Sequence, residues 1–235
     1  MQDNLGKKKA LILGATGLVG GQLLDLLLND NHYEEVRLLT RRPVAIEHSK
    51  LRQKTIDFKS MNEELTWFEV DDVFCCLGTT MAKAGTKEQF YYVDHDIPVQ
   101  AANMAQWHAN SFILISSIGA SRASPFYYLR VKGETEHDIL KTTISHICIL
   151  RPSMLLGVRS EIRTAEQVGG KVLNTFSGLM WGGLKKYRPI RAEVVAKAMQ
   201  ILAHTSQKGK YLYESQHIKD LVRGNSHSTP IVPTI

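Results

Sequence analysis

The stretch Ala10-Leu11-Ile12-Leu13-Gly14-Ala15-Thr16-Gly17-Leu18-Val19-Gly20 decides the fold of this chain. Four apolar residues have the pattern of a buried strand, and glycines at every third position then lead into an amphipathic pattern that runs to residue 28. Such glycines allow a tight turn and a close approach of the backbone to a pyrophosphate, while the helix amino terminus attracts the phosphates. The glycine pattern alone is a weak signal, but its position between a strand and a helix provides the confirming context. The stretch therefore predicts a dinucleotide-binding turn, with contacts from Gly14, Thr16, Gly17, Leu18 and Val19.

Beyond this turn, apolar runs typical of strands alternate with helical patterns, which predicts a parallel sheet covered by helices on both faces. The predicted strands are residues 9–13, 36–40, 54–57, 72–77, 112–116 and 146–150. The predicted helices are residues 18–28, 60–67, 88–108, 127–140 and 192–204. Because crossovers between parallel strands are right-handed, we expect an α/β fold with a doubly wound Rossmann-type sheet in a single domain.

The domain organisation follows from where this alternation stops. We assign residues 1–152 to the dinucleotide-binding core, residues 153–222 to a small substrate lid with closing helices, and the polar tail 223–235 to disorder. Between residues 153 and 189, glycines alternate with Phe176, Met180 and Trp181. Loop segments carried by a rigid sheet often shape ligand specificity, so we interpret this stretch as the lid; an excursion that only packs on the core is the alternative.

Composition narrows the class of protein. The 235 residues are 43% hydrophobic and 22% charged, which is ordinary for a globular protein. The net charge of +6 is mild and spread out, so we expect no nucleic-acid partner. No run approaches the roughly 20 apolar residues that span a bilayer, and the first residues lack the features of a signal peptide, so we expect no membrane span.

The cysteines and histidines argue against disulfides and metals. Cys75, Cys76 and Cys148 lie in apolar runs and do not form a disulfide framework, which indicates a reducing environment and predicts a cytoplasmic protein. The nine histidines show no His-Glu-x-x-His motif, and the chain has no Cys-x-x-Cys motif, so we expect no metal site.

The ends of the second, third and fourth predicted strands indicate the cofactor. Where an NAD site carries an acidic residue for the ribose, this chain has Arg41 and Arg42, and an arginine fits a 2′-phosphate, so NADP(H) is predicted. Asp57 ends the third strand, where it either meets the adenine amino group or simply forms a turn. The fourth strand leads into Leu77, Gly78 and Thr79, at the edge where ligands of such sheets lie.

Chemistry is predicted on the helix that follows the fifth strand. Tyr128 and Lys132 are four positions apart, so they share one helix face, and an ammonium near a phenol stabilises the phenolate. The preceding strand ends in Ser116 and Ser117. Tyr127 points about 100° away from Tyr128 and lacks a lysine four positions later, which makes it the poorer acid.

These motifs resemble the short-chain dehydrogenase/reductase superfamily in its atypical branch, and within it the Tat-interacting-protein oxidoreductase family. The likeness covers almost the whole chain and is most specific at Cys75-Cys76-Leu77-Gly78-Thr79-Thr80. It continues through Leu129-Arg130-Val131-Lys132-Gly133-Glu134 and Arg151-Pro152-Ser153-Met154-Leu155-Leu156.

The resemblance implies a role for each matching residue. Tyr128 is the expected proton donor or acceptor, Lys132 positions it and the nicotinamide ribose, and Ser117, with Ser116 as second choice, holds the substrate carbonyl. Cofactor contacts are implied for the glycine turn and for Arg41, Arg42, Leu77, Gly78, Leu155 and Arg163. After Leu156 the chain departs from the family pattern, which leaves the substrate open.

We therefore expect an NADP(H)-dependent oxidoreductase, a monomer or homodimer, that acts on a small carbonyl or alcohol. The alternative is an NADP(H)-sensing binding protein without turnover, although regulators of that kind often lack the Tyr/Lys pair. A nucleotide-sugar epimerase needs a larger sugar domain than the residues after Leu150 provide. The direction of the reaction and the physiological substrate stay open.

Overall fold

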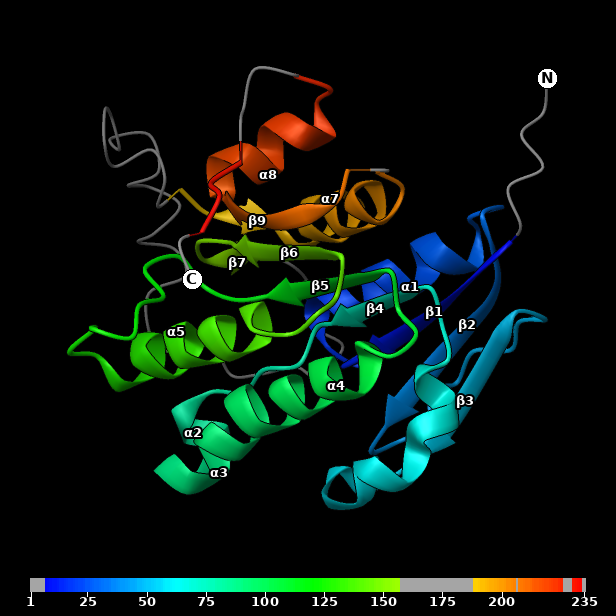
Figure 1. The fold of residues 1–235 in the computed structure, drawn as a ribbon, viewed down its shortest axis with the longest axis horizontal. Helices are drawn as coiled ribbons and strands as arrows, with labels where there is room; N and C mark the ends of the chain where they lie inside the picture. The colour runs from blue at the N-terminus through cyan, green and yellow to red at the C-terminus, as the bar shows by residue number, and fades with distance from the viewer. Residues whose placement is uncertain (1–6, 157–187, 206, 226–229, 234–235) are drawn as a thin grey trace.

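Seven parallel strands form the centre of the molecule, and helices cover both faces (Figure 1). The computed structural model describes residues 7–156, 188–205, 207–225 and 230–233. The strands are β1 (Lys8–Leu13), β2 (Tyr33–Thr40), β3 (Leu51–Thr55), β4 (Asp72–Cys75), β5 (Ser111–Ile115), β6 (His146–Arg151) and β9 (Gly209–Glu214). Their order in the sheet is β3-β2-β1-β4-β5-β6-β9, so the direction of winding reverses between β1 and β4. The predicted doubly wound Rossmann-type fold is confirmed, and its ligand crevice is expected at the carboxyl ends of β1 and β4.

Two layers of helices enclose this sheet. One face carries α1 (Leu18–Leu28), α7 (Ala192–Ala203) and α8 (Ser215–Val222). The other face carries the 3-10 helix η1 (Phe58–Phe68), α4 (Ile97–Ala105) and α5 (Tyr127–Leu140). The short helices α2 (Met81–Ala84) and α3 (Lys87–Tyr91) precede a π-helical turn, η2 (Tyr92–Asp96), that leads into α4.

Strand β1 shows why the sequence folds in this way. Ala10 and Ile12 pack into the core under α1 and α7, whereas Leu11 and Leu13 pack into the core under α4 and η1. Successive side chains of a strand point to opposite faces of the sheet. Because helices cover both faces, all four residues are fully buried. A continuous apolar run is therefore what a strand covered on both faces requires, and each large aliphatic side chain contributes about 1.5–3 kcal/mol of stability.

Several elements differ from the sequence-based expectations. The strand expected at residues 54–57 lies earlier, at β3, because its edge position leaves only Leu51 buried and gives no apolar run. The helix expected at residues 88–108 is helical over most of that span but contains the π-helical turn η2. The two-stranded sheet of β7 (Leu155–Leu156) and β8 (Ile190–Arg191) was not predicted.

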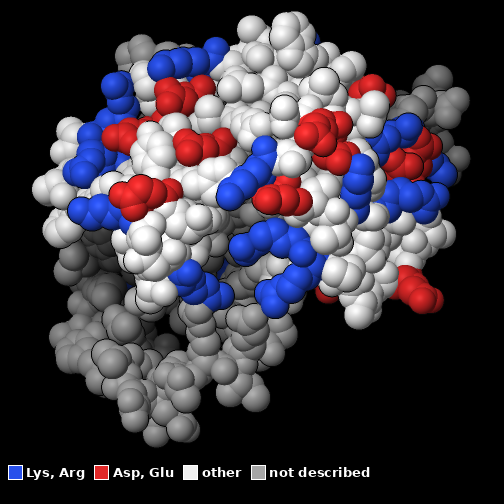
Figure 2. Space-filling view, turned by 90° about the horizontal axis from the view of Figure 1, so that it is seen from below, with Lys and Arg blue, Asp and Glu red and all other residues white. Residues whose placement is uncertain are grey.

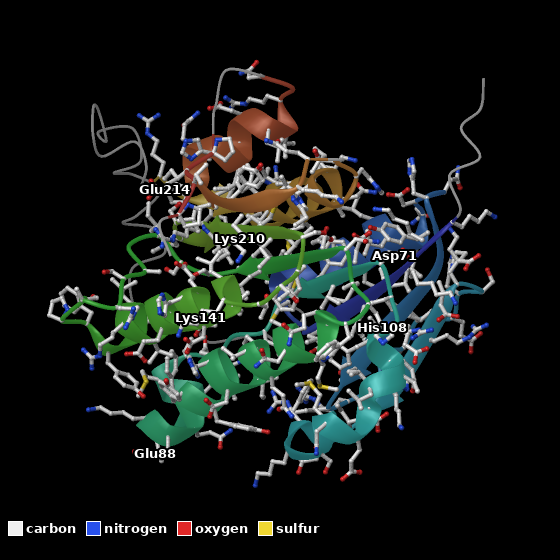
Figure 3. All side chains as sticks on the ribbon, in the orientation of Figure 1. Asp71, Glu88, His108, Lys141, Lys210 and Glu214 are labelled. Atoms are coloured by element: carbon white, nitrogen blue, oxygen red, sulfur yellow. The ribbon has the colours of Figure 1, made fainter. Side chains whose placement is uncertain are left out.

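The seventh strand, β9, was also missed, and it comes from the segment assigned to the lid and its closing helices. It pairs with β6 from His146 to Arg151. Lys210 of β9 donates hydrogen bonds to the Leu140 and Thr142 carbonyls at the end of α5, while Glu214 at its other end caps α8 (Figure 3). In the tail that was expected to be disordered, Ile231 forms an antiparallel bridge with Leu212 of β9.

Candidate functional site

The glycine turn after β1 is shaped by close packing. Gly14 has a φ of 88°, and a Cβ there would lie 2.7 Å from the Cys76 carbonyl oxygen. A Cβ on Gly20 would lie 2.2 Å from the Gly14 carbonyl oxygen, so any side chain at either position would displace the turn. Thr16 and Gly17 are exposed, and no side chain of the described chain caps the amino terminus of α1. The turn therefore fits a pyrophosphate, which would accept hydrogen bonds from the first amides of α1.

The predicted ribose and adenine residues lie at the ends of β2 and β3. Arg41 and Arg42 are exposed just beyond β2, where the Thr40 hydroxyl donates a 2.8 Å hydrogen bond to the Arg42 carbonyl. Asp57 caps η1 by accepting a 3.0 Å hydrogen bond from the Lys59 amide. Asp57 thus stabilises the turn between β3 and η1, as one of the two alternatives predicted. Its contact with adenine stays a prediction.

The loop after β4 lies close to Lys132 of α5, the helix that carries the predicted catalytic residues. The Thr79 amide donates a 2.8 Å hydrogen bond to Asp94 Oδ2. A Cβ on Gly78 would lie 3.6 Å from Asp94 Oδ1 and 3.8 Å from Lys132 Nζ. Leu77, before this loop, is half-buried against the core under α4.

Tyr128 and Lys132 differ in their surroundings although one turn of α5 separates them. Tyr128 is 38% exposed, whereas Lys132 is only 5% exposed. Lys132 Nζ lies 2.8 Å from Oδ1 of the fully buried Asp94. Burial lowers the pKa of Lys132, but the charge of Asp94 and the nearby Tyr128 hydroxyl outweigh this effect, and the pKa lies above its ordinary value. The structure therefore holds a charged lysine beneath an accessible phenol.

The two serines after β5 have different partners. The Ser116 hydroxyl is buried and donates to Glu136, which also accepts a 2.9 Å hydrogen bond from Arg151 Nε. Ser117 is half-buried, and its Oγ lies 3.4 Å from the Ile118 carbonyl oxygen, which is a long contact. Ser116 is thus committed to a network inside the protein, and Ser117 is the hydroxyl available to a ligand.

Tyr127 is separated from this arrangement by its own hydrogen bond. Its hydroxyl donates to the Lys87 carbonyl oxygen at 2.9 Å. Phe90 lies beside both tyrosines, with ring centroids 5.9 Å from Tyr127 and 5.8 Å from Tyr128. Tyr127 thus ties α5 to α3 and is not directed at Lys132.

Of the two remaining predicted cofactor contacts, the structure describes only Leu155. Leu155 belongs to β7 and packs against the core under α1 and α7. Arg163, together with the apolar lid residues Phe176, Met180 and Trp181, lies outside the described residues, so the lid stays a prediction.

Sequence reasoning missed two acidic residues of the site. Glu136 lies four positions after Lys132, so the face of α5 that carries Tyr128 and Lys132 continues to it. Asp94 gave no such signal, because the turn η2 that directs it at Lys132 was not predicted. π-Helical turns are rare and often occur at functional sites.

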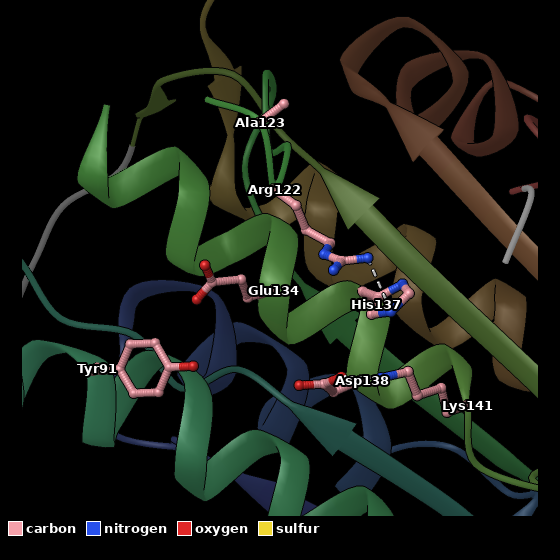
Figure 4. Close-up of a pocket in the computed structure, with 7 residues that line it drawn as sticks. All are labelled: Tyr91, Arg122, Ala123, Glu134, His137, Asp138 and Lys141. Atoms are coloured by element: carbon pink, nitrogen blue, oxygen red, sulfur yellow. Dashed lines mark hydrogen bonds and ion pairs between the residues drawn. The ribbon is translucent and has the colours of Figure 1, made fainter. Parts of the chain in front are cut away.

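A cavity on the outer side of α5 does not contain the predicted catalytic residues. It has a volume of about 470 Å³ and is lined by Tyr91, Arg122, Ala123, Glu134, His137, Asp138 and Lys141 (Figure 4). Several of its polar groups bind one another, since Arg122 Nη1 donates a 3.1 Å hydrogen bond to His137 Nε2 and Lys141 forms a 2.8 Å ion pair with Asp138. We therefore do not assign the substrate to this cavity.

Lys and Arg side chains border a hollow in the face of the molecule that is shown in Figure 2.

A second cluster lies near the carboxyl ends of α1 and α7. The carboxylate of Asp30 lies 2.8 Å from His32 Nδ1 and 2.6 Å from His204 Nε2. Two ligands of one tetrahedral zinc ion, each about 2.0–2.1 Å from the metal, would lie about 3.3 Å apart. The shorter distances identify hydrogen bonds that join the two helix ends.

Comparison with known proteins agrees with this architecture. Residues 9–99 match the model of the semialdehyde dehydrogenase NAD-binding domain. Among solved structures, the Bordetella bronchiseptica enzyme WbmH in complex with NAD+ superimposes with a TM-score of 0.67 at 15% identity, covering 97% of this chain and 85% of that one. The UDP-N-acetylglucosamine 4-epimerase from Methanobrevibacter ruminantium gives a TM-score of 0.66 at 15% identity, covering 89% of this chain and 77% of that one. At such identities the likeness concerns the fold alone.

The names of related proteins correct the expected location. Protein FMP52, mitochondrial, from Candida albicans is one of several relatives named as mitochondrial, which contradicts the prediction of a cytoplasmic protein. Free thiols indicate a reducing environment, and that property does not identify one compartment. In the described part of the chain, no helix has the length and apolar character needed to cross a bilayer.

Sequence similarity extends well beyond the cofactor turn. The Candida albicans protein is 35% identical over 208 residues, which cover 84% of this chain and 87% of that protein. Protein HTATIP2 from Rattus norvegicus is 37% identical over 169 residues, which cover 70% of this chain and 69% of that protein. The chain therefore belongs to the family of HTATIP2 and FMP52, the Tat-interacting-protein oxidoreductase branch of the atypical short-chain dehydrogenases/reductases.

Proposed function

We propose that this protein is an NADP(H)-dependent oxidoreductase that reduces a small carbonyl compound, with Tyr128 as the proton donor. Its NAD(P)-binding Rossmann fold is that of short-chain dehydrogenases and epimerases. The observation that carries the proposal is the accessible Tyr128 phenol, which lies one helical turn from the buried and charged Lys132, beside the Gly78 loop.

The cofactor would be held along the carboxyl edge of the sheet and supply a hydride. The amides that open α1 bind its pyrophosphate, and Gly78 leaves the loop after β4 open to its nicotinamide half. Arg41 and Arg42 face solvent just beyond β2, where a 2′-phosphate would lie. These arginines support NADP(H) over NAD(H), because a guanidinium pairs with a phosphate through two parallel hydrogen bonds.

Each catalytic side chain then has one task during reduction. Ser117 donates a hydrogen bond to the carbonyl oxygen as negative charge develops on it. Tyr128 transfers its phenolic proton to that oxygen while the carbonyl carbon receives the hydride, which leaves an alcohol and a phenolate. The Lys132 ammonium stabilises the phenolate until solvent returns the proton.

Binding and turnover should therefore separate in one variant. We expect Tyr128→Phe to bind NADPH with the affinity of the wild type, measured by calorimetry, and to lose at least about 100-fold in turnover with any carbonyl that a substrate screen identifies. Tyr127→Phe is the matched control, because its hydroxyl bonds to Lys87 and takes no part in proton transfer. Equal loss in both variants would refute the assignment of Tyr128.

The same measurements separate catalysis from sensing. If the protein binds NADPH but oxidises none in a broad carbonyl screen, and the alcohol panel with NADP+ is also negative, then it acts as a cofactor sensor. A nucleotide-sugar epimerase is a weaker candidate, because two structural neighbours named as epimerases share only 15% and 14% identity with this chain.

A further inference from the structure

The ion pair between Asp94 and Lys132 is sealed from solvent. Asp94 is fully buried, Lys132 is 5% exposed, and Lys132 Nζ lies 2.8 Å from Asp94 Oδ1. The second carboxylate oxygen accepts a 2.8 Å hydrogen bond from the Thr79 amide. One carboxylate thus joins the catalytic lysine to the loop that we assign to the cofactor.

Because Lys132 is buried, the Asp94 carboxylate determines whether the lysine keeps its positive charge. An ammonium removed from water is destabilised unless an opposite charge compensates for the lost solvation. The groups that act on the Lys132 pKa are Asp94 from η2, Tyr128 from the same helix and Cys75 from β4. Burial raises the pKa of Cys75 to about 11, which leaves this thiol uncharged near neutral pH. Asp94 is therefore the counter-charge among these groups.

We propose that Asp94 is a positioning residue that keeps Lys132 charged and fixed beneath Tyr128, and that links this charge to the Gly78–Thr79 loop. The proposal rests on the proposed function, since it gives Lys132 its task in the reaction. Asp94 acts through Lys132 and does not itself touch the substrate.

The π-helical turn explains how the chain places this carboxylate. Asp94 lies in the middle of η2, and the Asp94 carbonyl accepts a 2.8 Å hydrogen bond from the Thr135 hydroxyl of α5. Thr135 Oγ1 lies at the same distance, 2.8 Å, from the Val131 carbonyl oxygen, one residue before Lys132, so the single hydroxyl proton is shared between the two carbonyls. Side chain and backbone of Asp94 are therefore both bound to the catalytic helix, which leaves the carboxylate little freedom to move.

The informative variant is Asp94→Asn, because it removes the charge and retains an oxygen for the Thr79 amide. Without the carboxylate, the buried Lys132 ammonium has no counter-charge, so Lys132 releases its proton more easily. Reduction needs this ammonium in place beneath Tyr128. We therefore expect the alkaline decline of kcat to begin at least about one pH unit lower in this variant than in the wild type.

A readout that needs no turnover tests the same charge directly. The side-chain nitrogen-15 signal of Lys132, followed by NMR in the intact protein, should stay that of an ammonium up to pH 10 in the wild type. In Asp94→Asn we expect it to titrate at least about one pH unit lower than in the wild type. This measurement tests Asp94 even if no carbonyl is turned over, so failure of the proposed function and failure of this proposal are distinguishable.

Asp72→Asn is the matched control, because Asp72 is another buried carboxylate, at the opposite end of β4. It accepts hydrogen bonds from Tyr33 at 2.7 Å and from Ser111 at 2.6 Å, so its loss lowers stability without contact with Lys132. We expect the control to unfold at lower denaturant concentration with an unmoved pH profile. If Asp94→Asn behaves like this control, or if its Lys132 signal titrates as in the wild type, then Asp94 is only a structural residue and the proposal is wrong.

Discussion

Glu136 lies one helical turn after Lys132 on α5 and binds the ends of two strands at once. It accepts hydrogen bonds from Ser116, which follows β5, and from Arg151 at the end of β6. Lys132 binds Asp94 of η2 from the same helix. The helix is therefore held at two neighbouring turns, and Tyr128, one turn earlier, is placed by contacts that do not involve its own hydroxyl.

Breaking the Glu136 contact should destabilise the protein. Glu136 is almost fully buried and Arg151 is half-buried, so Glu136→Gln removes the carboxylate to which the Arg151 guanidinium is hydrogen-bonded inside the protein. We expect a loss of about 3 kcal/mol in the free energy of unfolding, measured by urea denaturation. Glu134→Gln is the control, because Glu134 is more exposed and lines the open cavity on the outer side of α5. Equal stability of the two variants would show that the Glu136 network contributes nothing.

Cofactor preference should depend on the two arginines beyond β2. We expect NADPH to bind at least about tenfold more tightly than NADH, a difference of about 1.4 kcal/mol, in calorimetric titrations. Arg41→Ala combined with Arg42→Ala should remove this difference, because the charge that favours a 2′-phosphate is gone. NADH affinity serves as the internal control and should hardly change. Equal affinities for the two cofactors in the wild type would contradict the prediction.

The fold could be predicted from the sequence where burial forces a simple pattern. Ala10 to Leu13 are buried on both faces of the sheet, so the strand is a continuous apolar run that needs no tertiary information. β9 was not predicted from the sequence, because it lies at the edge of the sheet and its sequence, Gly-Lys-Tyr-Leu-Tyr-Glu, mixes polar and apolar residues. Its strand pairing is decided by contact with β6, which is far away in the chain.

In the candidate site too, local sequence patterns predict some residues, whereas contacts between distant parts of the chain determine others. Tyr128 and Lys132 could be predicted because a helix brings residues four positions apart together. Asp94 could not, since it lies 38 positions before Lys132 and meets it only through the packing of η2 on α5. The resemblance ranked Ser117 before Ser116, but the physical reason for this order, the bond between Ser116 and Glu136, exists only in the folded protein.

The glycine turn offers a pair of neighbouring substitutions with opposite outcomes. A Cβ on Gly20 would lie 2.2 Å from the Gly14 carbonyl oxygen, whereas a Cβ on Gly21 would lie 3.5 Å from the Ala15 oxygen, an ordinary contact. We expect Gly20→Ala to lose NADPH binding and stability. Gly21→Ala should keep binding and gain about 0.5–1 kcal/mol of stability, because alanine favours the interior of a helix. Thermal denaturation with and without NADPH measures both effects, and similar behaviour of the two variants would exclude this model of the turn.

Acid should selectively weaken the cluster around Asp30. Burial raises the pKa of Asp30, but hydrogen bonds from the His32 amide, from His204 and from Gln200 outweigh this and hold the pKa well below its usual range. A carboxylate with a lowered pKa stabilises the folded state above its unfolded pKa of about 3.9, and this contribution is lost as the pH falls. We therefore expect Asp30→Asn to be less stable than the wild type at pH 7.

The difference in unfolding free energy between Asp30→Asn and the wild type should shrink below about pH 4 in urea titrations. Asp25→Asn provides the control, because Asp25 is exposed on the same helix α1. A difference that stays constant from pH 7 to pH 3 would show that the charge of Asp30 does not stabilise the fold.

The two adjacent serines should separate catalysis from stability. Ser117→Ala removes the hydroxyl that we assign to the developing oxyanion, so we expect turnover to fall by about 100-fold while NADPH affinity and the melting temperature stay near those of the wild type. Ser116→Ala removes a hydroxyl that bonds to buried Glu136, so we expect a loss of about 1 kcal/mol of stability and nearly unchanged turnover. Steady-state kinetics and urea denaturation of both variants provide the measurement. The reverse pattern, with Ser116→Ala inactive and Ser117→Ala active, would reassign the substrate carbonyl to Ser116 and require Glu136 to exchange its partner when substrate binds.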